Sequence, residues 1–214
     1  MEINENDTFE KFQKKLKQYG WFGTLLSMVK KIIRKLTAFS WDKYFLMVRK
    51  TDNLPPLPDK SFTVRELALA DYESPLWASF LDDDKKRLYI ERFANPNAKA
   101  YGVFVNQELA YSTWILYGEV VIRSRFHYSV PKDALLLDSY SHPKFRGMGL
   151  HNYMNLWCLH KMAQEGAENA FVVVLSYNRP AIKTQTKCGL RIVKKLYIFS
   201  FGHRQWCTLK NIPI

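Results

Sequence analysis

The sequence of 214 residues predicts an α/β domain with a mixed central sheet flanked by helices, preceded by a helical extension. Apolar residues recur at helical spacing near the N-terminus, short apolar runs typical of strands fill the middle, and strand and helix patterns alternate after Ala134. A content of 47% hydrophobic and 15% aromatic residues is ample for a packed core.

The chain is strongly basic, with a formal net charge of +12. Such a charge favours an anionic partner: a nucleic acid, a membrane surface, a phosphorylated ligand or an acidic protein. The three cysteines are widely spaced and include no CxxC pair, so neither a disulfide framework nor a metal site is predicted. The N-terminal MEINEND does not resemble a basic, apolar leader, and a cytoplasmic location is expected.

Residues 1–53 are predicted to form a basic amphipathic helical extension. Apolar positions recur at helical spacing over residues 8–39, and Gly20 and Gly23 are expected to divide this stretch into two helices. Two interpretations stay open. The extension packs on the domain or on a second subunit as a homodimer, which the apolar residues from Trp41 to Val48 favour, or residues 8–39 lie peripherally on an anionic membrane at its inner face.

The stretch NLPPLPDK marks a domain boundary, because it has three prolines in four positions. A helix cannot cross such a stretch, so residues 54–60 are predicted to be an extended linker. Residues 61–214 then form the α/β domain.

The first half of this domain is predicted to be rich in strands. The expected elements are a strand at Phe62–Glu66, a helical region at Asp71–Phe93, and strands at Ala100–Val105, Leu109–Tyr117, Val120–Tyr128 and Ala134–Ser141. The last of these strands contains the run ALLL, which is typical of a buried strand.

Helices and strands alternate in the second half. The expected elements are a helix at Leu150–Glu165 ended by Gly166, a strand at NAFVVVLSY, a helix at RPAIKTQTKCG, and strands at Leu190–Phe201 and Gln205–Leu209.

The loop SHPKFRGMGLHNYM, residues 141–154, lies between a predicted strand and a predicted helix and has no acidic side chain. Amides of a glycine-rich turn can point the same way, and the helix adds the positive end of its dipole. The loop is therefore a candidate phosphate-binding site, and an ordinary tight turn is the alternative. It is neither a Walker loop nor a dinucleotide fingerprint.

Two motifs resemble those of the GNAT superfamily of N-acetyltransferases. The first resembles the family's motif A, in which Arg/Gln-x-x-Gly-x-Gly/Ala follows a proline, and it consists here of Pro143, Arg146, Gly149 and His151. The second resembles motif B and consists of Asn178, Ala181, Lys187, Gly189 and Leu190. Both occur in the family's order and spacing, and the resemblance covers roughly residues 61–209.

The resemblance implies a GNAT fold, with splayed parallel strands and coenzyme A in the gap between them. It implies acetyl-CoA or another acyl-CoA as co-substrate and no metal. The acyl group would pass by direct attack to a primary amine of a small molecule, an amino sugar or a peptide. The cofactor-binding residues that it implies are Ser139, Ser141, Arg146, Gly147, Met148, Gly149, Leu150, His151 and Asn178.

Asp138 and Tyr140 alternate with the two serines and should point to the opposite, substrate side of the strand. A carboxylate inside the run ALLLDSY is costly unless it is paired, so Asp138 is a candidate general base or ammonium-binding group. The alternative is a structural aspartate that caps a loop or pairs with an arginine such as Arg123.

The sequence departs from the family at two positions. His151 replaces a small residue, so its imidazole either touches a phosphate or lies on the surface of a helix. Gln185 stands where many members carry a tyrosine that protonates the leaving thiolate, and an amide is not an acid. Water, Tyr177 or Tyr140 must then supply the proton, or the fold serves another use. Cys188 is expected to be a packed thiol.

Three functions follow. The first is an acyl-CoA-dependent N-acyltransferase. The second is a fatty-acyl transferase whose donor is an acyl carrier protein, since such acidic proteins suit the charge of +12. The third is a non-enzymatic basic module. Nucleic acid is disfavoured as its partner, because lysine and arginine are interspersed rather than clustered on a reading helix.

Overall fold

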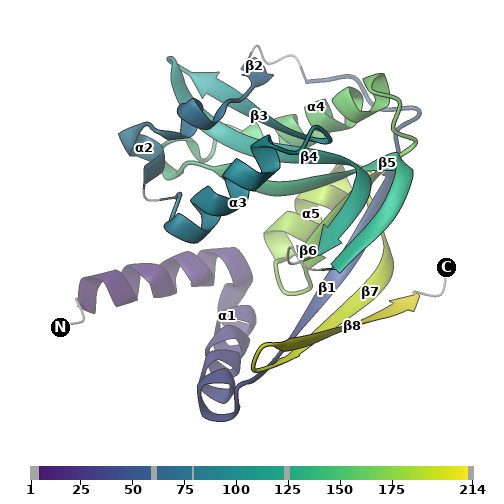
Figure 1. The fold of residues 1–214 in the computed structure, drawn as a ribbon. Helices are drawn as coiled ribbons and strands as arrows, with labels where there is room; N and C mark the ends of the chain where they lie inside the picture. The colour runs from purple at the N-terminus through teal and green to yellow at the C-terminus, as the bar shows by residue number, and fades with distance from the viewer. Residues whose placement is uncertain (1–4, 59–61, 79, 123–125, 212–214) are drawn as a thin grey trace. The chain divides into compact units, whose positions relative to one another are not determined.

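The computed structural model describes residues 5–58, 62–78, 80–122 and 126–211 (Figure 1). Its strands and helices form the predicted mixed α/β fold. The chain divides into two compact units. We call Val48–Val172 the β5 unit, and Met1–Met47 together with Val173–Ile214 the α1 unit. The divisions fall inside two strands, β1 and β6.

The β5 unit contains a mixed sheet. Its strands are β2 (Thr63–Glu66), β3 (Ala98–Val105), β4 (Glu108–Ile122), β5 (Phe126–Ser141) and the first residues of β6 (Asn169–Leu175). Antiparallel pairs join β2 to β3, β3 to β4 and β4 to β5, and β6 runs parallel to β5. Neighbouring strands from β2 to β5 are therefore antiparallel to each other, and the pairing of β5 with β6 is parallel.

Strand β5 pairs with the first residues of β6. The ladder joins Asp133–Leu136 to Asn169–Val172 within the β5 unit. Strand β5 continues beyond this ladder to Ser141, and this last part of the strand carries predicted site residues.

The β5 unit has five helices among its described residues. They are η1 (Leu69–Tyr72), α2 (Pro75–Ala78), α3 (Asp83–Phe93), η2 (Pro143–Phe145) and α4 (Leu150–Gln164). Helix α4 matches the prediction to within one residue. The helical region predicted at Asp71–Phe93 is divided into η1, α2 and α3. Asp82 starts α3 afresh, because its side chain accepts a hydrogen bond from the backbone N–H of Lys85 at 2.9 Å.

The three strands predicted between Leu109 and Ser141 are two long strands. The predicted strand Val120–Tyr128 is wrong, because β4 ends at Ile122 and β5 begins at Phe126. No glycine or proline marks this reversal in the sequence. Pro131 lies inside β5 without ending it. The register between β5 and β4 shifts at this point, and a residue in such a β-bulge does not have to donate a backbone hydrogen bond, which proline cannot do.

Aromatic residues dominate the core of the β5 unit. Tyr72, Trp77, Tyr89 and Trp114 are buried in one cluster against β3 and β4. Trp77 Nε1 donates a hydrogen bond to the Leu109 carbonyl at 2.7 Å. Tyr72 meets both Trp77 and Tyr89 edge to face. The cluster fixes η1, α2 and α3 to the face of the sheet on which Tyr140 also packs.

Gly102→Ala should destabilise this core. An added Cβ on β3 would meet Leu109 Cδ1 at 2.5 Å and Leu67 Cδ2 at 2.7 Å, and both leucines are buried. Overpacking costs about 1–3 kcal/mol, which exceeds the ~0.5–1 kcal/mol gained by replacing a strand glycine. We expect the free energy of unfolding in urea to fall by about 1–2 kcal/mol. Adding Leu109→Ala makes room, so the double variant should lose less than the sum of the two single losses. Additive losses would contradict the clash.

The α1 unit contains α1 (Glu5–Thr37), β1 (Phe39–Lys50), the end of β6, α5 (Arg179–Lys187), β7 (Arg191–Phe201) and β8 (Arg204–Asn211). The hydrogen-bonded order of its strands is β6-β1-β7-β8, and β7 and β8 form an antiparallel hairpin. Helix α1 contacts α5.

Strand β1 is absent from the sequence-based prediction, which made residues 1–53 a helical extension. The helix ends at Thr37, because Ala38 adopts a left-handed φ of 55°, and Phe39–Lys50 then forms a strand. The apolar residues from Trp41 to Val48 are therefore part of a sheet. Their aromatic content suits a half-buried strand as well as it suits a helix surface.

The predicted break in α1 is confirmed at Gly20, which adopts φ 69° and ψ 178°, a conformation almost restricted to glycine. The break predicted at Gly23 is wrong. Gly23 is helical and buried, and an added Cβ would lie 2.8 Å from Tyr19 Cβ and 3.5 Å from Tyr177. This glycine permits close packing and does not interrupt the helix.

Candidate functional site

The site is built around a β-bulge near the end of β5. Thr113 of β4 lies opposite both Asp138 and Ser139, because the register shifts at this point. Asp138 adopts a left-handed φ of 52°, which a residue other than glycine rarely adopts. Bulges of this kind re-aim side chains, and here the bulge lies near the end of β5.

Ser139 and Ser141 lie on the face of the strand that α4 covers. Ser139 Oγ is 2.7 Å from Thr113 Oγ1. Ser141 pairs in register with Tyr111, whose hydroxyl is 2.7 Å from His151 Nδ1 at the start of α4. The predicted cofactor-side serines therefore belong to the same face as the start of that helix.

Asp138 lies on the other face, toward α3. Its Oδ2 is 3.0 Å from Arg92 Nη1, and its Oδ1 is 3.7 Å from Lys85 Nζ. Arg123, the partner considered from the sequence, lies outside the described residues. Both carboxylate oxygens face a cation, as the paired alternative expects. A catalytic role for Asp138 stays a prediction.

Sequence reasoning missed these two cations. Lys85 and Arg92 are seven positions apart on α3, with Tyr89 between them on the same side, so helical periodicity could have grouped them. Lys85 Nζ lies 3.4 Å from the centre of the Phe80 ring, and the Arg92 guanidinium lies 5.5 Å from that of Trp114. Burial lowers the pKa of Lys85, and the nearby Asp138 opposes that shift.

Tyr140 shares this face with Asp138. Its ring stacks on Phe80 with 3.8 Å between centroids and meets Trp77 edge to face at 5.3 Å. Burial raises the pKa of Tyr140 above its usual value. The side chain therefore stays a protonated phenol at neutral pH, which is the form that a proton donor needs.

The loop before α4 is exposed and has an unusual backbone. Gly147 and Gly149 adopt left-handed φ values of 86° and 81°. Phe145 and Leu150, which flank this part of the loop, are buried and anchor it. Arg146 Nε donates to the Ser141 carbonyl at 3.4 Å, which holds the side chain beside the end of β5. Exposed amides, an arginine and a helix N-terminus together can bind an anion.

His151 is half-buried and turned toward Tyr111, whose hydroxyl its Nδ1 meets at 2.7 Å. Burial lowers the pKa of His151, which keeps its imidazole neutral at pH 7. A neutral imidazole can accept or donate the hydrogen bond to the tyrosine hydroxyl, depending on its tautomer. The residue thus ties the first turn of α4 to β4.

Acid should weaken the fold through this histidine. The unfolded chain, with a histidine pKa near 6.5, binds a proton more readily than the folded chain does. The stabilisation is therefore fully present above about pH 6.5 and is lost as the pH falls toward the lower folded pKa. Burial also lowers the pKa of His142, which adds to the same window. His151→Gln should remove part of the slope of Tm against pH between about 5 and 7. Parallel Tm curves for the two proteins would contradict this.

Asn178 belongs to the α1 unit, unlike the other predicted site residues. It caps α5, accepting a hydrogen bond from the Ala181 N–H at 3.3 Å. Gln185 is 3% exposed, and its Oε1 has no hydrogen-bond partner in the described part of the chain. Cys188 is buried, as expected of a packed thiol.

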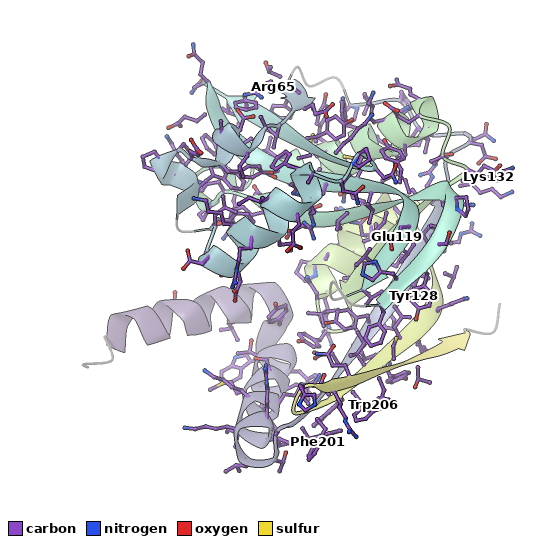
Figure 2. The ribbon with its side chains drawn as sticks, in the orientation of Figure 1. Arg65, Glu119, Tyr128, Lys132, Phe201 and Trp206 are labelled. Carbon is purple, nitrogen blue, oxygen red and sulfur yellow. The ribbon has the colours of Figure 1, made fainter. Side chains whose placement is uncertain are left out.

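A small pocket of about 190 Å³ opens between α3 and the strands of the β5 unit. Trp114 and Leu137 give it an apolar wall, and Arg92, the partner of Asp138, also lines it. Glu91 and Glu119 add two carboxylates (Figure 2 labels Glu119 on β4). No group of three His, Cys, Asp or Glu side chains is placed to hold a metal ion within the described ranges.

No family model matches the sequence, and no curated protein does. Solved structures do. A putative acetyltransferase of the GNAT family from Novosphingobium aromaticivorans has a TM-score of 0.52 at 17% identity, over 81% of this chain and 66% of that chain. A GCN5-related N-acetyltransferase from Sphaerobacter thermophilus has a TM-score of 0.55 at 10% identity, over 88% and 58%. A functionally unknown conserved protein from Staphylococcus epidermidis has a TM-score of 0.57 at 14% identity, over 80% and 66%. The chain spans less than two thirds of the length of each.

Proposed function

Because the chain has the GNAT fold that its two motifs predict, we propose that it is an acyl-CoA-dependent N-acyltransferase acting on a primary amine. One observation carries the proposal. An exposed, acid-free loop with two left-handed glycines joins the end of β5 to the N-terminus of α4. Such a loop at a helix N-terminus suits a ligand that has a pyrophosphate.

The loop residues fit a pyrophosphate. Gly147 and Gly149 are exposed, and no heavy atom lies within 4 Å of the position that a Cβ would take on Gly147. Arg146 adds a positive charge, and the amides of Gly147, Met148, Gly149, Leu150 and His151 would complete the cradle. Ser139 and Ser141 would face the bound cofactor from β5.

The amine acceptor would enter from the α3 face. The pocket there is lined by two carboxylates, Glu91 and Glu119, of which Glu119 is hydrogen-bonded to His127. Arg92, which also lines it, is paired with Asp138, so Glu91 would be the carboxylate that attracts a cationic amine. The pocket volume of about 190 Å³ is below that of pockets for drug-sized ligands. A small amine or an amine-bearing side chain therefore fits better than a whole oligosaccharide.

The reaction forms a bond between the amine nitrogen and the acyl carbon and breaks the bond from that carbon to sulfur. The amine must lose a proton, and the leaving thiolate must gain one. Asp138, beside the pocket-lining Arg92, would hold or deprotonate the ammonium. Tyr140, which stays a phenol, would protonate the thiolate in place of the tyrosine that Gln185 replaces.

The test is the release of the coenzyme A thiol from acetyl-CoA, followed with a panel of small primary amines and lysine-containing peptides. We expect release that depends on the amine and an acylated product of the matching mass. Release only from an acyl-loaded carrier protein would replace the proposed donor. A folded chain that acylates nothing with either donor would overturn the proposal.

A further inference from the structure

The second half of α1, residues 21–37, exposes an apolar stripe. Its members lie three or four positions apart and so share one helical face. Their exposed fractions run from 41% to 78%, and they are Trp21, Phe22, Leu25, Met28, Val29, Ile32 and Leu36.

The opposite face of the same helix is the packed one, and it mixes small, polar and apolar residues, including the half-buried Leu26 and Ile33. Gly23 and Thr24 are buried, and Gly23 lies against Tyr177. Lys30, half-buried, pairs with Asp42 of β1 at 3.0 Å. A surface helix ordinarily buries most of its apolar residues. Helix α1 leaves this wide apolar stripe exposed, as sites of interaction with a partner outside the chain do.

The side chains around the stripe are positively charged, which favours an anionic partner. Between residues 11 and 41 the sequence has eight lysines and arginines and no aspartate or glutamate. Lys31 and Lys35, on the flank of the stripe, are exposed and have no ion-pair partner among the side chains that the structure describes. A basic flank on an apolar helical face is the signature of a helix that lies in an anionic lipid interface.

Further aromatic surface lies next to the end of this helix. Phe201 and Trp206, on the β7–β8 hairpin, are exposed by 56% and 50% (Figure 2). The hairpin is tied to the helix end, because the Gly202 N–H donates to the Ala38 carbonyl at 3.0 Å. Tryptophan and phenylalanine side chains favour the boundary between lipid headgroups and acyl chains.

We propose that this stripe binds the α1 unit to the surface of an anionic phospholipid bilayer, with the second half of α1 lying in the plane of the interface. No described helix is long and apolar enough to cross a membrane. A second copy is a poorer occupant, because pairing two stripes would bring together two segments with eight positive charges each. The packing interpretation drew on residues from Trp41 to Val48, and those belong to β1. This proposal does not depend on the acyltransferase function.

Vesicle flotation of the full chain tests the proposal. We expect it to float with vesicles of phosphatidylcholine mixed with phosphatidylglycerol and far less with phosphatidylcholine alone. The triple variant Trp21→Ser, Leu25→Ser and Ile32→Ser should bind at least about a hundredfold more weakly, because it removes three apolar side chains without changing the charge. The control is Ile90→Ser, at an apolar position on α3 that is 48% exposed, and this variant should bind like the wild type.

The charge contribution has its own variant. Lys31→Gln with Lys35→Gln leaves the stripe intact and should weaken binding to the anionic vesicles by about thirtyfold, with little effect on neutral vesicles. Because all five changed positions are exposed, the Tm of each variant should stay close to that of the wild type.

Three outcomes would overturn the proposal. One is that the folded wild type does not float with either kind of vesicle. The second is equal binding to neutral and anionic vesicles. The third is a lipid-free dimer, seen by light scattering, that the triple variant converts to a monomer, because a second copy would then cover the stripe.

Discussion

Gly149→Glu is expected to abolish the binding of coenzyme A while leaving the chain folded. Gly149 is exposed, has a φ of 81° and caps the N-terminus of α4. A glutamate there would place a negative charge and added bulk where the proposed pyrophosphate sits, and it would cancel the attraction of the helix dipole. We expect affinity to fall by at least about a hundredfold, measured by calorimetry with coenzyme A.

A matched control separates charge from backbone strain. Gly166, just past the other end of α4, has a φ of 84°, and no heavy atom lies within 4 Å of its Cβ position. Gly166→Glu thus carries the same left-handed strain, about 1–2 kcal/mol, without touching the loop. Both variants should lose a few degrees of Tm, and only Gly149→Glu should lose coenzyme A. Unchanged affinity in a folded Gly149→Glu protein would remove the loop from the site.

Asp138→Asn should lower kcat/KM by about a hundredfold or more if the carboxylate holds the ammonium or takes its proton. The substitution preserves shape, and asparagine tolerates the left-handed φ of 52° at this position. It leaves Arg92 and Lys85 close together without the carboxylate that both now face. Some loss of stability is therefore expected whatever the catalytic role.

The two roles of Asp138 are separated by measuring Tm and acyl transfer across a range of pH. A purely structural aspartate would lose Tm while the folded fraction turned over substrate at nearly the wild-type rate. Asp71→Asn is the matched control, because Asp71 is also held by an arginine, Arg65, which lowers the pKa of that carboxyl. It should cost stability alone.

The loop and the helix after it were predictable from the sequence because their causes are local. The two glycines of the loop provide the left-handed backbone that the turn needs, and the apolar positions from Leu150 onward set one face of α4. The same holds for α5, whose N-cap is Asn178. Each of these elements depends on residues within a few positions of one another.

The surroundings of Asp138 depended on tertiary contacts. Its bulge arises from the register with β4, and its two cations come from α3, far away in the sequence. An apolar run with one aspartate indicates that a partner is needed, but it does not identify the partner. Strand β1 was missed for a similar reason, because aromatic residues suit a helix surface and a sheet alike until strand neighbours are known.

In helix α1, local sequence and tertiary contacts each fixed a different property. By itself the sequence determined that Trp21, Leu25 and Ile32 share a face and that Gly20 breaks the helix, since both follow from helical period and backbone conformation. Only the tertiary structure decided that this face is exposed and that the face with Gly23 is packed against Tyr177. Periodicity states which side chains lie together on a helix. What those side chains meet depends on the shape and chemistry of surfaces contributed by distant parts of the chain.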